Sequence, residues 1–287
     1  MIRTLPENLI RLNIAGITVA LEIADDDKRA AISERYREFI VSDEEPESII
    51  RVEVSSGAQF IPMNPGPWIT EISYSGRLLN YRSHLDAGQI DIERGEAVLE
   101  IAPEADVENF LRVLYAQLCL RAGGLLLHAA GVVGGDAGFV FFGPSGSGKT
   151  TAARLSPGRT ILSDDLVILR TSGKRTLVHG VPFRGDLPEA PRVNMSADLR
   201  GLFTLVKAPE HALTSVDLPE ATARLLACAP FVMGDARNIK RAMEICLRIA
   251  RNVPVRALRF RLDPGFWRVI DECETPCPAP AGGNANS

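Results

Sequence analysis

The pattern of hydrophobic and polar positions changes character about a third of the way along the chain. Up to residue 103 apolar residues mostly alternate with polar ones, as in residues 48–56, and this alternation predicts strands. Turn signals at Gly16, Ser75-Gly76 and Arg94-Gly95 divide the region into hairpins. Residues 25–40 interrupt it with a short amphipathic helix that has an acidic start. We therefore expect a small β-rich module over residues 1–105.

Beyond residue 105 the chain alternates between helical and strand patterns. An apolar stripe at helical spacing predicts a helix within residues 104–124, followed by strands over 125–133 and 138–143. Further on, the pattern predicts short and long helices, several strands and an irregular stretch; these are a helix at 148–156, strands at 160–170 and 201–208, an irregular region at 182–200, helices at 217–229 and 235–252, and a strand at 255–262. Residues 106–274 thus read as one α/β domain, and residues 275–287 as a disordered tail.

Composition and charge narrow the class of protein. The chain is 46% hydrophobic and 24% charged, has no run of eighteen apolar residues, and does not begin with the apolar core of a signal peptide. We expect a cytoplasmic protein without a membrane partner. A net charge of −4 argues against a general nucleic-acid binder. The second half is the more basic, which suits an anionic ligand such as a phosphate, although two domains with independent surface charge explain the asymmetry equally well.

Five scattered cysteines do not form a recognisable metal site. Cys119 and Cys246 lie in apolar helical stretches and are expected to be core thiols. Cys273 and Cys277 lack a second cysteine pair or a nearby histidine, so the spacing does not predict zinc.

The strongest motif is a phosphate-binding loop at residues 143–151. Its sequence GPSGSGKTT matches G-x-x-x-x-G-K-[ST], and it follows a buried strand and opens a helix. Glycines let backbone N–H groups converge on phosphate oxygens, Lys149 would reach the β- and γ-phosphates, and the Thr150 hydroxyl would bind Mg²⁺. The expected nucleotide-binding residues are Gly143, Ser145, Gly146, Ser147, Gly148, Lys149, Thr150 and Thr151.

Two further features carry candidate chemistry. Asp164 and Asp165 follow an apolar strand fifteen residues after Lys149, and adjacent carboxylates beside a phosphate loop usually include a metal-binding one. The alternative is a solvated strand end. His128 lies in the apolar run Leu125–Ala130, where an isolated histidine is more often an ordinary core residue than a catalytic one.

Taken together, these features resemble the HPr kinase/phosphatase family, which belongs with the ATP-type phosphoenolpyruvate carboxykinases. The resemblance covers residues 124–172: a strand with His128, a hairpin, the phosphate loop, a short helix and a strand reaching Asp164-Asp165. It implies an α/β fold consisting of a phosphoenolpyruvate carboxykinase-like nucleotide-loop domain with a small β-rich N-terminal module. The layout looks most like that of HPr-kinase-like proteins from peptide-modification cassettes, including lasso-peptide kinases and SynChlorMet cassette proteins.

The resemblance also implies roles for single residues. Asp164 resembles the catalytic base, assisted by His128, while Lys149 binds the transferred phosphate, and Asp165 with Thr150 holds the metal. The expected function is an ATP- and Mg²⁺-dependent kinase acting on a hydroxyl of Ser or Thr in a peptide or small protein. Two alternatives stay open, a kinase for a small molecule such as a free amino acid and a weakly hydrolysing nucleotide sensor or scaffold. The sequence leaves the oligomeric state open, a homo-oligomer included.

Overall fold

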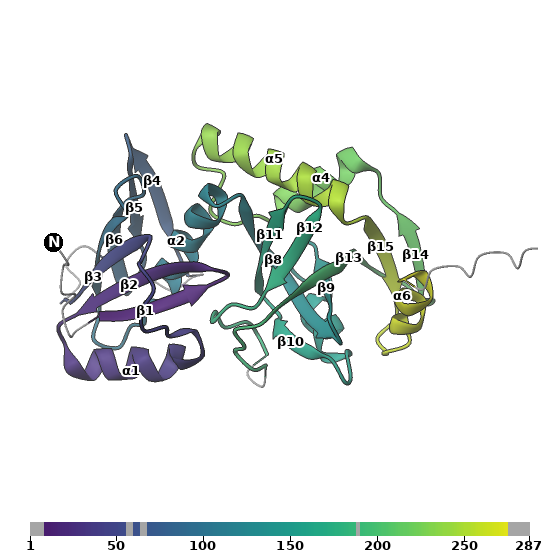
Figure 1. Ribbon diagram of the computed structural model, residues 1–287, viewed down its shortest axis with the longest axis horizontal. Helices are drawn as coiled ribbons and strands as arrows, with labels where there is room; N and C mark the ends of the chain where they lie inside the picture. Colours follow the sequence, from purple (N-terminus) through teal and green to yellow (C-terminus); the bar gives the residue numbers. More distant parts are fainter. Residues whose placement is uncertain (1–8, 56–59, 64–67, 188–189, 275–287) are drawn as a thin grey trace, which may run out of the picture.

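The computed structural model describes residues 9–55, 60–63, 68–187 and 190–274. It is a mixed α/β structure with one β-sheet in each half of the chain, and helix α2 (Glu108–Arg121) lies between the two sheets (Figure 1). The predicted mixture of strands and helices is confirmed at this level. None of the helices in the described ranges is long and apolar enough to span a membrane.

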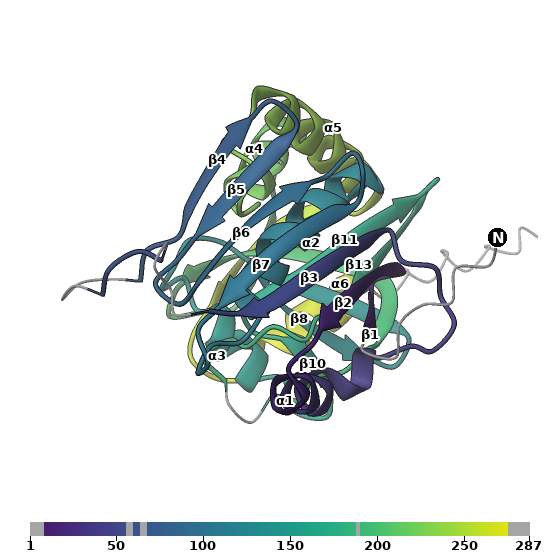
Figure 2. The same ribbon diagram turned by 90° about the vertical axis from the view of Figure 1, so that its left-hand side faces the viewer.

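The first sheet has seven strands in the order β1-β2-β3-β7-β6-β5-β4 (Figure 2). They are β1 (Leu9–Ile14), β2 (Ile17–Ile23), β3 (Ser48–Val54), β4 (Glu71–Ser75), β5 (Leu78–Arg82), β6 (Asp86–Asp91) and β7 (Glu96–Ile101). The predicted hairpin turns are present, each with a glycine at positive φ: Gly16, Gly76 and Gly95. Helix α1 (Asp26–Tyr36) and the 3-10 turn η1 (Arg37–Phe39) join β2 to β3, and α1 packs against β1 and β2.

The second sheet contains eight strands and closes on itself. The strands are β8 (Gly124–Gly134), β9 (Ala137–Phe142), β10 (Thr160–Ser163), β11 (Leu166–Ser172), β12 (Arg175–His179), β13 (Ser196–Lys207), β14 (Ala212–Ser215) and β15 (Val255–Phe260). Pairing runs in a ring through β8, β9, β13, β12, β11 and back to β8. In this sheet the parallel pairs among the described strands are β9–β13 and β13–β15. The loop after β9 therefore leaves the sheet at the carboxyl ends of its parallel strands, where ligands of α/β proteins usually bind.

Helices cover both faces of the second sheet. Helices α4 (Leu218–Ala227) and α5 (Ala236–Asn252) share a buried cluster with one face. Helices α3 (Lys149–Arg154) and α6 (Phe266–Glu274) share another with the opposite face. Strand β8 contributes Leu127 to the first cluster and Ala130 to the second, as alternating side chains of a strand require. The predicted core thiols Cys119 and Cys246 are fully buried.

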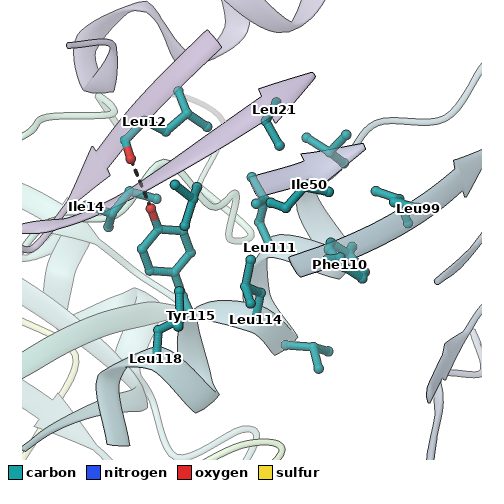
Figure 3. Close-up of a cluster of buried hydrophobic side chains, with 14 of the residues drawn as sticks. Leu12, Ile14, Leu21, Ile50, Leu99, Phe110, Leu111, Leu114, Tyr115 and Leu118 are labelled. Atoms are coloured by element: carbon teal, nitrogen blue, oxygen red, sulfur yellow. Dashed lines mark hydrogen bonds between the residues drawn. The ribbon is translucent and has the colours of Figure 1, made fainter. Parts of the chain in front are cut away.

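Helix α2 ties the two halves of the chain together. Its apolar side chains lie in one buried cluster with Leu12, Leu21, Ile50 and Leu99 of the first sheet (Figure 3). The buried Tyr115 hydroxyl lies 3.2 Å from the carbonyl oxygen of Leu12 and 3.1 Å from that of Ile17, and donates its hydrogen bond to them. The same cluster includes residues of β8 and β11, so the two sheets share a core.

The structure departs from the predicted elements in three places. The segment 160–170 is two strands rather than one, because the Ser163 hydroxyl accepts the N–H groups of Asp165 (3.2 Å) and Leu166 (3.1 Å) and turns the chain. Strand β13 begins at Ser196, inside the stretch predicted to be irregular, since its first residues pair with β12. Strand β14 was not predicted at all. The predicted disordered tail, with Cys277, lies outside the described residues.

Candidate active site

The predicted phosphate loop has the expected strand–loop–helix setting, between β9 and α3. Gly143, Gly146 and Gly148 have φ of 149°, 75° and 109°, a region that favours glycine. A side chain at Gly148 would also approach Phe260 Cζ to 3.0 Å. Glycine therefore adopts the backbone conformation of this loop without strain, whereas other residues at these three positions would be strained.

Lys149 lies folded over this loop. Its Nζ donates hydrogen bonds to the carbonyl oxygens of Gly143 (3.1 Å) and Pro144 (3.2 Å), and the residue is only 6% exposed. Burial lowers the pKa of Lys149, and negative charges that include those of Asp165 and Asp186 partly offset this effect. The cation is therefore held at the loop, close to carboxylates on other segments.

Asp164 and Asp165 occupy the corner between β10 and β11, and their side chains enter different surroundings. Asp164 is 3% exposed, and its Oδ2 accepts the N–H groups of Asp186 (3.0 Å) and Leu187 (3.1 Å). Burial raises the pKa of Asp164, although hydrogen bonds from the Thr150 hydroxyl and from backbone N–H groups act in the opposite direction. Asp164 thus lies next to the threonine that the phosphate-loop motif assigns to the metal.

The Asp165 carboxylate contacts two basic side chains, His128 and Arg112. Its Oδ1 lies 3.3 Å from His128 Nε2, and its Oδ2 accepts a hydrogen bond from Arg112 Nη1 at 3.1 Å. Burial alone would raise the pKa of Asp165, but the hydrogen bond from His128 and the charges of Arg112, His128 and Lys149 outweigh it, so the pKa is lowered. Asp165 therefore stays ionised more firmly than its neighbour.

The partner of His128 differs from the predicted one. We expected His128 to assist Asp164, yet its imidazole contacts Asp165. The cause is strand register: His128 on β8 faces Leu166 on β11, and the Ala129 N–H bonds to the Asp165 carbonyl oxygen at 2.9 Å. Successive residues point in opposite directions, so only one aspartate can face the histidine. The His128 side chain is 40% exposed and lines the cleft, unlike an ordinary core residue.

These groups line one cleft of about 360 Å³. Its walls are His128, Ser145, Gly146, Gly148, Lys149, Thr150, Thr151, Asp164, Asp165, Asp186, Lys207 and Leu262. Sequence reasoning missed Asp186 and Lys207 here, and also Arg112 behind Asp165. The only available signal for Arg112 was its spacing from Glu108 on α2, which predicts the i,i+4 ion pair found at 2.7 Å.

The cleft offers hard oxygen ligands that suit Mg²⁺. The Thr150 hydroxyl and the carboxylates of Asp164, Asp165 and Asp186 line the same space. No cluster of three or more His, Cys, Asp or Glu residues with metal-binding geometry occurs within the described residues. Mg²⁺ in nucleotide sites usually takes one or two carboxylates, several waters and the phosphates, so this donor set fits an ion that arrives with a nucleotide.

Comparison with known proteins identifies the family. The model of the SynChlorMet cassette protein ScmC matches residues 105–274, more than half of the chain. The chain belongs to the ScmC family. This confirms the predicted resemblance to the SynChlorMet cassette branch. Every residue that lines the cleft lies within the ScmC match, whereas the first sheet and α1 lie outside it.

The comparisons with solved structures and with curated proteins do not extend this identification. The structure of the Hpr(Ser) kinase/phosphatase from Coxiella burnetii is similar over 52% of this chain and 95% of that chain, with 10% sequence identity and a TM-score of 0.29. A likeness at this level supports no statement about the activity of the ScmC-family chain. No curated protein matches the chain significantly.

Proposed function

We propose that this ScmC-family protein is a Mg²⁺- and ATP-dependent kinase that phosphorylates a Ser or Thr hydroxyl in a peptide or small protein. The observation that carries the proposal is the convergence, in one cleft, of six phosphate-loop residues, the Thr150–Asp164 contact and the Asp165–His128 contact. A cytoplasmic location and a phosphoenolpyruvate carboxykinase-like arrangement of the second sheet belong to the same proposal.

Nucleotide binding is assigned to the loop and to Lys149. The N–H groups of residues 143–151 would bind the phosphate oxygens, and Lys149 Nζ would exchange its bonds to the Gly143 and Pro144 carbonyls for phosphate oxygens. Thr150 and Asp165, with Asp186 nearby, would hold the metal ion, which when bound neutralises charge on the β- and γ-phosphates.

Asp164 is assigned as the general base. In the reaction the acceptor oxygen forms a bond to the γ-phosphorus, the bond from that phosphorus to the β–γ bridging oxygen breaks, ADP leaves, and the acceptor proton passes to Asp164. A base works best when its pKa approaches the operating pH, and the pKa of Asp164 is raised whereas that of Asp165 is lowered. His128 and Arg112 then act through Asp165, whose position and charge they maintain.

One observation favours the opposite assignment of the base and metal-binding roles to Asp164 and Asp165 within the same function. His128 contacts Asp165 rather than Asp164, and a histidine–carboxylate pair is a common arrangement for proton transfer. In this version Asp165 is the base and Asp164, beside Thr150, holds the metal. The two versions make opposite predictions for the Asp164→Asn and Asp165→Asn variants, which are developed in the Discussion.

The test is transfer of labelled γ-phosphate from ATP to three acceptors: a degenerate Ser/Thr peptide library, free serine and threonine, and water. We expect labelled peptides in the presence of Mg²⁺ and none in excess EDTA, with Lys149→Ala as the inactive control. Preferential labelling of free amino acids would support the small-molecule kinase instead. Bound ATP with only slow phosphate release would support the sensor, and full turnover in EDTA would contradict the role of the metal.

A further inference from the structure

A second and larger cavity adjoins the same aspartates. Its volume is about 1100 Å³, and it lies between the α1–η1 segment of the N-terminal module and the described residues of segment 181–193. Asp164 and Asp186 line both this groove and the nucleotide cleft. A hydroxyl presented from the groove is therefore directed at the carboxylate that the proposed function assigns as the base.

The groove carries a cluster of guanidinium groups from both parts of the chain. Arg35 on α1 is paired with Asp106 at 2.6 Å and with Glu108. Arg184 and Arg192 also line the groove, and the described part of the chain pairs neither of them with a carboxylate. Carboxylates line the groove as well, but Glu34 and Glu38 are paired with Arg37, and Asp164 and Asp186 lie at the nucleotide cleft. Arg184 and Arg192 are thus the groove cations without an ion pair among the described residues.

Arg192 is the most constrained of these cations. Its Nη1 donates to the Arg35 carbonyl oxygen at 3.2 Å, and its Nη2 is buried and has no hydrogen-bond partner among the described residues. Burial, and then the positive charges of Arg35 and Arg184, lower the pKa of Arg192, and the negative charge of Glu108 only partly offsets them. A buried donor without a partner is costly, and a carboxylate is the strongest acceptor for a guanidinium N–H. An anionic group bound here would relieve both the unmet hydrogen bond and the repulsion between like charges.

The size of the groove bears on the kind of acceptor. Pockets for small ligands usually have volumes of about 300–1,000 Å³, and the nucleotide cleft falls in this range whereas the groove exceeds it. A free amino acid would occupy only a small part of it. An extended peptide segment fits a groove of this volume that is lined by Asp164.

We infer that this groove binds the acceptor as a peptide segment, and that Arg184 and Arg192 recognise an acidic residue close to the phosphorylated hydroxyl. The inference rests on the proposed kinase function and names its substrate class: Ser or Thr in an acidic sequence context. Because α1 forms one wall, the N-terminal module takes part in choosing the acceptor, although it lies outside the ScmC match.

The test uses Ser peptide libraries in which Asp or Glu is fixed at each neighbouring position in turn, with labelled ATP. A charge-assisted hydrogen bond contributes on the order of 1.5–3 kcal/mol, so we expect about a 10- to 150-fold preference for an acidic residue at one or two positions. Arg192→Gln and Arg184→Gln should remove most of this preference while leaving ATP affinity unchanged. Arg184→Glu should turn the preference towards Lys or Arg.

Arg248→Gln provides the matched control, because Arg248 lies on α5 and lines neither cavity. It should keep the acidic preference, and melting curves check that each variant is folded. Peptides labelled without an acidic preference, or a preference that survives both Gln variants, would overturn the inference and leave the kinase proposal standing. Preferential labelling of free serine would also overturn it. If ATP binds but no acceptor is labelled, the kinase proposal itself fails.

Discussion

Asp164 and Asp165 are sequence neighbours with opposite electrostatic surroundings. Asp164 is buried under the backbone of residues 185–187, and its pKa is raised. Asp165 lies between Arg112 and His128, and its pKa is lowered. Two groups whose environments move their pKa values apart are suited to different tasks in one reaction.

This difference predicts distinct effects for the two asparagine variants. If Asp164 is the base, Asp164→Asn should lower kcat by about 10²- to 10⁴-fold with ATP affinity nearly unchanged. The wild-type rate should fall on acidification at a pH above the ordinary Asp pKa of about 3.9, since the raised pKa makes Asp164 protonate sooner. Asp165→Asn removes a negative charge that raises the pKa of Asp164, so this acid limb should move to lower pH.

Single-turnover rates measured across pH, on the best peptide acceptor, check both statements. His128→Ala should shift the same limb less than Asp165→Asn, because it removes the contact but not the carboxylate. A wild-type rate in Asp164→Asn together with an inactive Asp165→Asn would transfer the role of base to Asp165.

Lys149 gives a prediction about binding rather than chemistry. Lys149→Ala removes the cation beside the phosphate loop, and a charge-assisted contact contributes on the order of 1.5–3 kcal/mol, so ATP affinity should fall by about 10- to 150-fold. Calorimetric titration with ATP measures this change. Lys240→Ala on α5, outside the cleft, is the control. Equal affinities in the Lys149 variant and the wild type would contradict the assignment.

The sequence reveals some of these residues and hides others for a physical reason. Residues 143–151 and the Asp164-Asp165 pair are contiguous, so a local pattern identifies them. Asp186 contacts Asp164 although the two residues are 22 positions apart in the sequence. Arg112 contacts Asp165 although 53 positions separate them. No local pattern encodes such contacts. The orientation of His128 depends on the register between β8 and β11, which is equally non-local.

At the scale of elements, segment 184–187 links α2 to the corner between β10 and β11. Glu108 on α2 accepts the Arg184 N–H at 2.8 Å, and Arg112 donates to the Arg184 carbonyl oxygen. Two residues later the segment donates to Asp164. Between these anchors, Gly185 packs so closely that an added Cβ would lie 2.0 Å from Asp164 Oδ1.

Gly185→Ala should therefore displace this segment from Asp164. Overpacking of this kind typically costs about 1–3 kcal/mol, and the lost N–H donors would leave Asp164 with weaker hydrogen bonding. We expect a lower melting temperature and a reduced kcat. Gly173→Ala is the control, because no described atom lies within 4 Å of the added Cβ. The φ of 60° at Gly173 means that alanine lowers the stability there, but the residue lies outside the cleft. An unchanged kcat in Gly185→Ala would show that the segment does not position Asp164.

Elements with local signals were predicted well, and elements defined by distant pairing were not. The hairpins of the first sheet and helices α2 and α5 follow from periodicity and turn glycines. The early start of β13 and the presence of β14 depend on pairing with β12 and β15. The polar residues Ser196 and Asp198 resemble a loop until that pairing is known.

At the scale of the whole molecule, the shared core makes the two halves depend on each other. Apolar residues of α2, β8 and β11 lie in one buried cluster with the first sheet. A chain limited to the ScmC match, residues 105–274, would expose the α2 side chains that this sheet covers. We expect it to be poorly soluble or to bind a hydrophobic dye, whereas residues 1–274 retain every contact described above. Circular dichroism and dye binding on both chains test this. A monomeric, cooperatively melting 105–274 fragment would contradict it.

The shared core also has a consequence for synthesis on the ribosome. The strands of the first sheet are complete once Ile101 has been made, but the cluster that covers them extends to Phe183, 82 residues later. At roughly 5–20 residues per second, these strands wait roughly 4–16 s for their last partners. Helix α2 is made soon after Ile101 and covers part of the sheet, but the apolar side chains that later pack with β8, β11 and Phe183 stay exposed during that interval. We expect this chain to engage a ribosome-associated chaperone before release, and its yield in a cell to depend on that encounter more than its final stability suggests.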